Sequence, residues 1–200
     1  EFFVPPAATY NSSSAHFLSP LRQNVHIWDA TSGEYIRKLI NVSTSADIVS
    51  ACFALPFERR LVLGTEDGRI LLVNYVTGAI LDDIHPHSSE VTQLVYCKGT
   101  KVIISADDRG TVTITSEMQC KLKELRHING VHGTGVAITH IAYSYRLSRI
   151  ITCPTAAKVQ VLGFQHLDCL AAATQNRTEP CTGVAFLERC SIVVLGDLTM

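Results

Sequence analysis

The chain has 200 residues, 46% of them hydrophobic, which is enough for a packed core and excludes a disordered polypeptide. Its 17 Lys and Arg balance 18 Asp and Glu without a long run of like charge, so neither nucleic acid nor an anionic membrane surface is an expected partner. Membrane insertion is not expected either, because no stretch reaches the roughly 18 apolar residues of a membrane-spanning helix.

A short pattern recurs along the chain: a polar position, small or apolar residues, an aromatic residue, a turn and a β-branched run. In the four clear copies the aromatic residues lie 43, 47 and 43 residues apart, at Phe53, Tyr96, Tyr143 and Phe186. Tyr10 belongs to a weaker first copy, 43 residues before Phe53. A period of about 40 to 45 residues is typical of β-propeller blades.

Each copy continues with strand-like runs separated by turns. In the clearest unit the runs cover residues 49–53, 60–64, 70–73 and 79–84, and Glu66-Asp67-Gly68 is a tight hairpin signal. The next two units repeat this order, with runs at 102–105, 112–115 and up to about 125, then at 149–153, 159–162 and 167–173. A helical repeat of similar length is excluded, because few windows carry an apolar i, i+3, i+4 stripe and β-branched residues abound.

Four strands per unit predict an all-β fold, a partial β-propeller of four-stranded antiparallel blades that bury their faces by stacking on each other. The predicted blades cover residues 1–40, 48–84, 91–126, 138–173 and, in part, 181–200. That makes about four and a half blades, and propellers commonly close with seven. We therefore expect residues 1–200 to be one fragment of a larger ring, able to self-associate through its open edges.

Residues 25–29, Val-His-Ile-Trp-Asp, followed by Ala30-Thr31-Ser32-Gly33, resemble the third strand and following turn of a WD-repeat protein. In later units the Trp-Asp pair is degenerate, as Val73-Asn74, Thr115-Ser116 and Leu162-Gly163. The family also has a Gly-His pair before the first strand and a buried Asp-His-Ser/Thr-Trp network in each blade. No Gly-His pair occurs here, and no unit shows all four network members, so some blades should depend on apolar packing.

Histidines in the inter-blade loops are the nearest substitutes for the missing Gly-His histidine: His85, His87, His127 and His132. His85 and His87 could also chelate a metal, but Pro86 separates them and no third ligand is predictable, so we expect no metal or other cofactor. The Gly-rich run 129–135 lacks the Lys-Ser/Thr of a phosphate-binding loop, and we interpret it as a flexible connection.

Paired acidic residues occur at Glu66-Asp67, Asp82-Asp83 and Asp107-Asp108, the residue types that hydrolases use. Turn chemistry accounts for the first pair and nearly for the third, and no nucleophile is recognisable beside them. The chain is therefore not expected to be an enzyme. The alternatives left open are a propeller-type hydrolase with an axial site and a phosphoinositide-binding propeller, whose paired-arginine motif the run Phe57-Glu58-Arg59-Arg60 partly resembles.

Seven cysteines, an odd number, include no C-x-x-C pair, which argues against a disulfide framework and a zinc site. We interpret them as small buried apolar residues, which indicates a reducing, intracellular compartment. The triplets N-x-[ST] at Asn11, Asn41 and Asn176 are glycosylation acceptors in secreted proteins, but no secretion signal accompanies them.

The family resemblance implies a non-catalytic scaffold that presents its loops to partner proteins, because loops on rigid sheets concentrate recognition. The candidate contact residues come from the turns between second and third strands and from the inter-blade loops: Glu66, Asp67, Arg69, His85, His87, Asp107, Asp108, Arg109 and His132. The runs 141–151 and 184–188 also resemble large WD-repeat proteins of protists and cilia. We therefore expect a cytoplasmic location in a cytoskeletal or ciliary setting.

Overall fold

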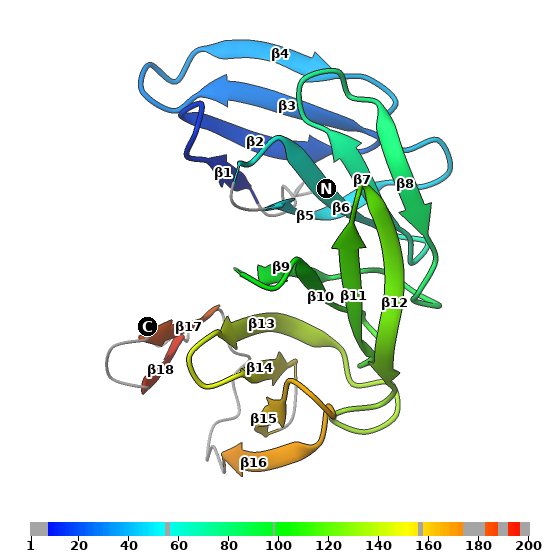
Figure 1. Ribbon diagram of the computed structural model, residues 1–200, viewed down its shortest axis with the longest axis vertical. Helices are drawn as coiled ribbons and strands as arrows, with labels where there is room; N and C mark the ends of the chain where they lie inside the picture. Colours follow the sequence, from blue (N-terminus) through cyan, green and yellow to red (C-terminus); the bar gives the residue numbers. More distant parts are fainter. Residues whose placement is uncertain are drawn as a thin grey trace.

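The computed structural model describes residues 8–54, 57–97, 99–155, 158–173, 183–187 and 192–196. Across these ranges the chain forms 18 β-strands and no helix. The strands make four four-stranded antiparallel sheets and one two-stranded sheet, arranged around an arc (Figure 1). The predicted all-β fold with four-stranded propeller blades is therefore confirmed.

Each sheet is a meander in which every strand pairs with the next one along the chain. Blade 1 contains β1 (Thr9–Asn11), β2 (His16–Leu21), β3 (Asn24–Asp29) and β4 (Tyr35–Leu39). Blade 2 contains β5 (Ile48–Ala54), β6 (Arg60–Thr65), β7 (Ile70–Asn74) and β8 (Ile80–Ile84). Blade 3 contains β9 (Gln93–Cys97), β10 (Val102–Ala106), β11 (Val112–Met118) and β12 (Lys121–Ile128). Blade 4 contains β13 (Ile138–Ser144), β14 (Arg149–Pro154), β15 (Val159–Gly163) and β16 (Cys169–Ala173), and a hairpin of β17 (Gly183–Leu187) and β18 (Ile192–Gly196) follows.

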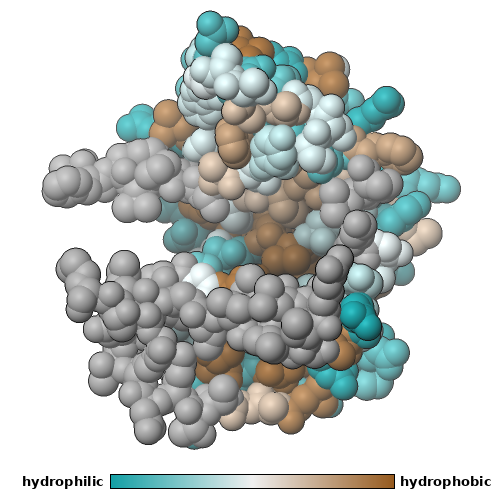
Figure 2. Space-filling model, turned by 90° about the vertical axis from the view of Figure 1, so that its left-hand side faces the viewer, coloured by the Kyte–Doolittle hydropathy of each residue, from teal (hydrophilic) through white to brown (hydrophobic). Residues whose placement is uncertain are grey.

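The first strands of the sheets lie innermost and contact one another, as β5 with β9, β9 with β13 and β13 with β17. The second strands β6 and β10 are almost wholly buried, whereas the fourth strand β4 is largely exposed and β8 is exposed or half-buried. Figure 2 shows the open side of the arc, with apolar side chains at the floor of the hollow between the upper and lower blades. The order from axis to rim therefore follows the order of the strands in each blade.

The apolar core consists of layers between successive blades. Side chains of blade 1, such as Leu18 and Ile27, pack with side chains of blade 2, such as Leu61 and Val73, in one cluster. Separate clusters join blade 2 to blade 3 and blade 3 to blade 4. Each blade is thus stabilised by its neighbours, as the repeat length implied.

A register shift recurs at one position in all four complete blades, where the third strand pairs with the fourth. It falls between Ile27 and Trp28, Leu72 and Val73, Ile114 and Thr115, and Val161 and Leu162. Such bulges increase the local twist of a sheet. The four blades therefore share this bulge, although the residues at their Trp-Asp positions differ.

An ion pair also joins blade 2 to blade 3. Arg60 Nη1 lies 2.7 Å from Glu117 Oε1, and Glu117 is buried. The guanidinium of Arg60, an arginine of the run 57–60, is thus paired with a buried carboxylate, and its side chain is half-buried. No helix among the described residues has the length and apolarity needed to cross a membrane.

Candidate docking face

Turns between second and third strands and the inter-blade loops lie together at one end of the blades. We define this docking face by residues 65–69, 85–91, 106–111 and 129–137. Backbone hydrogen bonds connect these segments: Glu90 O accepts from Asp108 N at 3.1 Å, and Gly110 O accepts from Val131 N at 3.0 Å. Loops far apart in sequence therefore form one continuous surface.

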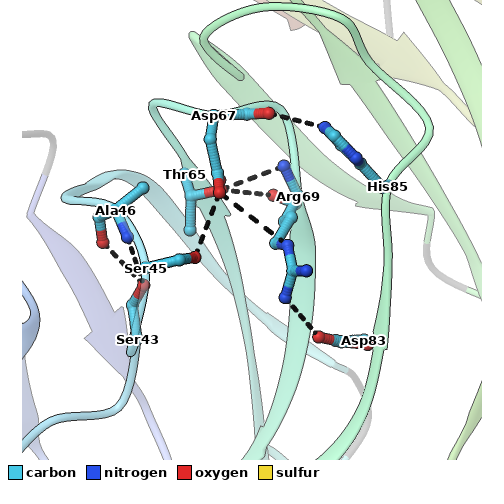
Figure 3. Close-up of polar contacts among 8 residues, drawn as sticks. All are labelled: Ser43, Ser45, Ala46, Thr65, Asp67, Arg69, Asp83 and His85. Atoms are coloured by element: carbon cyan, nitrogen blue, oxygen red, sulfur yellow. Dashed lines mark hydrogen bonds and ion pairs between the residues drawn. The ribbon is translucent and has the colours of Figure 1, made fainter.

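Asp67 stands at the tip of the blade 2 hairpin and is held by hydroxyl groups (Figure 3). Its Oδ1 accepts from Thr65 Oγ1 at 2.5 Å, and its Oδ2 accepts from Ser45 Oγ at 3.0 Å. Burial raises the pKa of Asp67, but these hydrogen bonds and the charge of Arg69 outweigh it and leave that pKa lowered. The carboxylate is therefore ionised and fixed in place at neutral pH.

Arg69, just before β7, and His85, just after β8, complete this cluster (Figure 3). Arg69 Nη1 lies 2.8 Å from Asp83 Oδ2, while its Nε lies 3.8 Å from Asp67 Oδ2. His85 Nε2 lies 2.6 Å from the backbone oxygen of Asp67. Since these groups are partly exposed, each ion pair contributes little to stability, and their effect is to orient the hairpin.

His87 and Asp107 form a wholly buried polar network in blade 3. His87 Nδ1 lies 3.1 Å from Asp107 Oδ2, and His87 Nε2 lies 2.7 Å from Ser105 Oγ. Burial raises the pKa of Asp107, but hydrogen bonds from His87 and from the backbone N–H of Thr111 outweigh it, so the pKa is lowered. The ionised carboxylate accepts a hydrogen bond from Nδ1–H, which fixes the imidazole ring.

The equivalent polar groups of blade 4 are fewer. His132 Nε2 lies 2.9 Å from Thr152 Oγ1, and Thr152 occupies the strand position that Ser105 holds in blade 3. Pro154 stands where blade 3 has Asp107, so no carboxylate meets this imidazole. Burial lowers the pKa of His132, an effect that the backbone of Lys158 only partly offsets.

The nine candidate contact residues occupy three kinds of position. Glu66, His85, Asp108 and Arg109 are exposed, and Asp67, Arg69 and His132 are intermediate. The side chains of His87 and Asp107 have no exposed surface and cannot meet a partner, because they hold the inside of blade 3 together. The sequence identified both as contact candidates by their place in a loop or a turn. That place does not reveal which way a side chain points.

A depression of about 530 Å³ lies beside Arg109, and sequence reasoning did not find it. Its lining combines one guanidinium, hydroxyl groups and a Gly-rich backbone: Ser88, Arg109, Thr111, Asn129, Gly130, Gly133, Thr134 and Gly135. The run 129–135 is bonded to blade 3 through Val131 and internally between Gly133 N and Gly130 O, so it forms a wall of this depression. Only the fold brings this loop against the blade 3 turn.

Acidic side chains also lie near one another on this face, among them Glu66, Glu90 and Asp108. Burial raises the pKa of Glu90, and the nearby charges of Asp108 and Glu66 raise it further. The face therefore presents a negative region beside the cationic depression at Arg109. A partner of mixed charge would match this pattern better than a purely acidic or basic one.

Two cysteines lie in first strands, Cys52 in β5 and Cys97 in β9. Burial raises the pKa of Cys52 to about 12 and also raises that of Cys97, so both first-strand thiols are protonated and unreactive. Among the described side chains, no group of three or more His, Cys, Asp or Glu could hold a metal ion. The chemistry of this face is that of hydrogen bonds and ion pairs.

Comparison with known proteins bears on the fold and on a ciliary relationship. No family model matches the chain. Cilia- and flagella-associated protein 337 B of Tetrahymena thermophila is 25% identical over 118 residues, which are 58% of this chain and 9% of that protein. A β-propeller chain in the crystal structure of the mitotic checkpoint complex superposes with a TM-score of 0.79 at 16% identity, covering 96% of this chain and 56% of that one. The chain therefore has a β-propeller fold and spans a small part of its ciliary relative.

Proposed function

We propose that this chain is a non-catalytic scaffold that binds partner proteins at the docking face. The observation that carries the proposal is the combination of buried anchors with exposed charges. His87 and Asp107 fix the loops from inside, while Glu66, Asp108 and Arg109 project from them. A rigid loop loses little conformational entropy on binding, which favours specific recognition.

Two comparisons agree with this proposal. The matched propeller chain comes from a structure described as a protein complex, and the ciliary relative is named for its association with cilia and flagella. We accordingly place the proposed partners among proteins, in a cytoplasmic setting that is cytoskeletal or ciliary. A hydrolase or a phosphoinositide binder has weaker support, since the first-strand thiols are protonated and Arg60 is engaged by Glu117.

The test is quantitative affinity capture with a face variant and a matched control. The face variant carries Glu66→Ala, Asp108→Ala and Arg109→Ala. The control variant, Glu34→Ala, Glu124→Ala and Arg126→Ala, removes the same charges from exposed positions outside the face. We expect proteins that wild type and control both retain to be lost by the face variant, at least tenfold, since several charged contacts are removed.

Two outcomes would contradict the proposal. Equal capture by all three proteins would place the interaction elsewhere on the molecule. Recovery of no partner together with measurable turnover of a small molecule would favour an enzyme, and sedimentation with phosphoinositide vesicles but not with neutral ones would favour the lipid binder.

A further inference from the structure

The turns between second and third strands in blades 2 and 3 have the same backbone hydrogen bonds. They cover residues 65–69 and 107–111. In both, the N–H of the first residue donates to the carbonyl oxygen of the fifth, and the N–H of the fourth donates to that of the first. The turns therefore align residue by residue, and Arg109 stands where blade 2 has Asp67. The two tips thus carry opposite charges.

The charge of Asp67 is balanced within the chain, whereas that of Arg109 is not. The carboxylate of Asp67 accepts hydrogen bonds from two hydroxyl groups and lies 3.8 Å from Arg69 Nε. The side chain of Arg109 is exposed, and its guanidinium has no ion-pair or hydrogen-bond partner within the part of the chain that the structure describes. Because a guanidinium presents five N–H donors in a planar fork, Arg109 is ready to bind an oxyanion from outside the chain.

Arg109 borders the depression of about 530 Å³ on the docking face. Besides the guanidinium, the lining offers the hydroxyl groups of Ser88 and Thr134, the side-chain amide of Asn129 and the backbone of three glycines. In blade 2 the first residue after the fourth strand is His85, which bonds to the turn and covers it. In blade 3 that residue is Asn129, and the glycines after it have no side chains to fill the space. The depression is therefore lined by hydrogen-bond donors and stays open.

The walls of the depression are fixed to each other by hydrogen bonds. Asp107 Oδ1 accepts from the N–H of Arg109 at 3.1 Å and from that of Thr111 at 2.6 Å. Gly110 O accepts from Val131 N at 3.0 Å, which holds the Gly-rich run against the turn. The site is thus formed without a ligand, and a preformed site loses little conformational entropy on binding.

We propose that the depression at Arg109 binds the carboxylate of an acidic residue in a partner protein, a proposal that rests on the docking face being the binding surface. A carboxylate accepts two parallel hydrogen bonds from one guanidinium. Its remaining lone pairs suit the hydroxyl groups of Ser88 and Thr134, which belong to the same lining. Pockets of roughly 300 to 1,000 Å³ take small ligands, so a depression of about 530 Å³ has room for an acidic side chain.

The charges around the depression favour a carboxylate over a phosphoryl group. Among the described residues that line it, Arg109 is the one cation. A phosphoryl group carries about −1.5 to −2 charges at neutral pH, and a carboxylate carries one. Asp108 directly precedes Arg109, and its carboxylate lies close enough to Glu90 to act on it. One guanidinium beside these acidic groups therefore balances a carboxylate but not the larger charge of a phosphoryl group.

The same acidic groups indicate what flanks the carboxylate in the partner. Asp108 and Arg109 are adjacent, so their Cα atoms are about 3.8 Å apart. A basic partner residue that pairs with Asp108 must therefore lie within a few residues of the acidic residue that enters the depression. We expect a partner segment with an acidic and a basic residue close together, because Glu66, Glu90 and Asp108 would repel a uniformly acidic one.

NMR titration of the isotope-labelled whole chain tests the proposal with three defined probes. The Glu peptide, acetyl-Gly-Glu-Gly-Lys-Gly-amide, and the Gln peptide, acetyl-Gly-Gln-Gly-Lys-Gly-amide, differ only in the carboxylate, and inorganic phosphate supplies the other oxyanion. We expect the Glu peptide to shift the amide signals of residues 129–135 and the Nε–H signal of Arg109, with a dissociation constant of about 1 mM. The Gln peptide should bind about tenfold more weakly, since it lacks the charged acceptor.

Three variants assign the binding to the guanidinium. Arg109→Gln should weaken the Glu peptide about tenfold and leave the Gln peptide unchanged. Arg109→Lys keeps the charge but loses the planar fork, so its affinity for the Glu peptide should lie between those of wild type and Arg109→Gln. Arg59→Gln removes an exposed arginine from the turn before β6, outside the docking face, and should change neither affinity. Circular dichroism checks that each variant is folded.

The contrary results are distinct. Equal affinities for the two peptides would overturn the proposal, and so would an Arg109→Gln variant that binds the Glu peptide as well as wild type does. Tighter binding of inorganic phosphate than of the Glu peptide would assign the depression to a phosphoryl group instead. If Arg109→Gln alone retains every protein that the face variant loses in affinity capture, the docking face stands and the carboxylate site is rejected. If the face variant loses none, the proposed function itself fails.

Discussion

Blade 3 and blade 4 share one fold and differ in what lies inside their connecting loops. In blade 3 an imidazole, a hydroxyl and a carboxylate are joined by hydrogen bonds. The side chains of His87 and Asp107 have no exposed surface. In blade 4 the carboxylate is missing, and His132 Nε2 meets the hydroxyl group of Thr152 on the strand. The sheets form in both cases, so apolar stacking builds the blade and the polar network fixes the loop above it.

Removal of the carboxylate of Asp107 should have the largest effect, because it takes from blade 3 the group that blade 4 lacks. Asp107→Ala leaves the buried His87 and the buried N–H of Thr111 without their acceptor, and the part-buried N–H of Arg109 as well. We expect a loss of about 3 kcal/mol or more, which lowers the melting temperature by roughly 6 to 12 °C for a protein of this size. Pro154→Ala, at the equivalent position of blade 4, should change the free energy of unfolding by less than about 1 kcal/mol. Equal effects of the two substitutions in thermal unfolding would contradict a special role for the network.

The contact of the blade 3 turn, which contains Gly110, with the Gly-rich run 129–135 and Val136 gives a second contrast. Gly110 has φ +83°, and a Cβ there would lie 2.6 Å from the backbone oxygen of Val136. Gly135 has φ +75° but has open space around the Cβ position. In urea unfolding we expect Gly110→Ala to lower the stability by about 2 kcal/mol or more and Gly135→Ala by about 1 kcal/mol. Both alanines would adopt the unfavourable left-handed backbone conformation, but only the one at position 110 would also clash with a backbone atom. A smaller cost at Gly110 would mean that the blade 3 end of the loop is not anchored.

Mild acid should loosen blade 4 before blade 3. Burial lowers the pKa of His132 and of His140, so these histidines bind protons less readily in the folded blade than in the unfolded chain. Their contribution is complete above about pH 6.5 and is lost as the pH falls towards the lower folded-state values. Asp107, whose folded pKa is lowered, keeps its contribution until the pH falls below about 4.

Hydrogen exchange followed by mass spectrometry measures this order. From about pH 7 to about pH 5, peptides of β13 and β14 should lose protection while those of β9 and β10 keep theirs. His132→Gln with His140→Gln should remove the pH dependence, and His127→Gln, an exposed histidine, should not. Parallel loss in both blades would refute the assignment to the half-buried His132 and His140.

The same two blades show what the sequence could and could not predict. Repeat length, β-branched runs and hairpin signals were sufficient for the four-stranded blades, because these are local patterns. Asp107 and Asp108 are adjacent and chemically identical, yet one is buried and the other exposed. That outcome depends on which side of the turn faces His87, a residue 20 positions away. The depression at Arg109 depends likewise on a loop from the next blade.

The smallest expected effect would sharpen the comparison by giving blade 4 the missing carboxylate. Pro154 follows Thr152 by two residues, as Asp107 follows Ser105, and the strand register places both at the same point of the blade. Pro154→Asp should therefore stabilise the chain by about 0.5 to 1 kcal/mol through a hydrogen bond with His132. It should also raise the pKa of His132, measured by NMR titration, whereas Pro154→Asn should raise it less because it brings no charge. If Pro154→Asp instead destabilises the chain as an unpaired buried carboxylate would, the two positions are not equivalent, and the loop of blade 4 places its histidine outside the reach of that carboxylate.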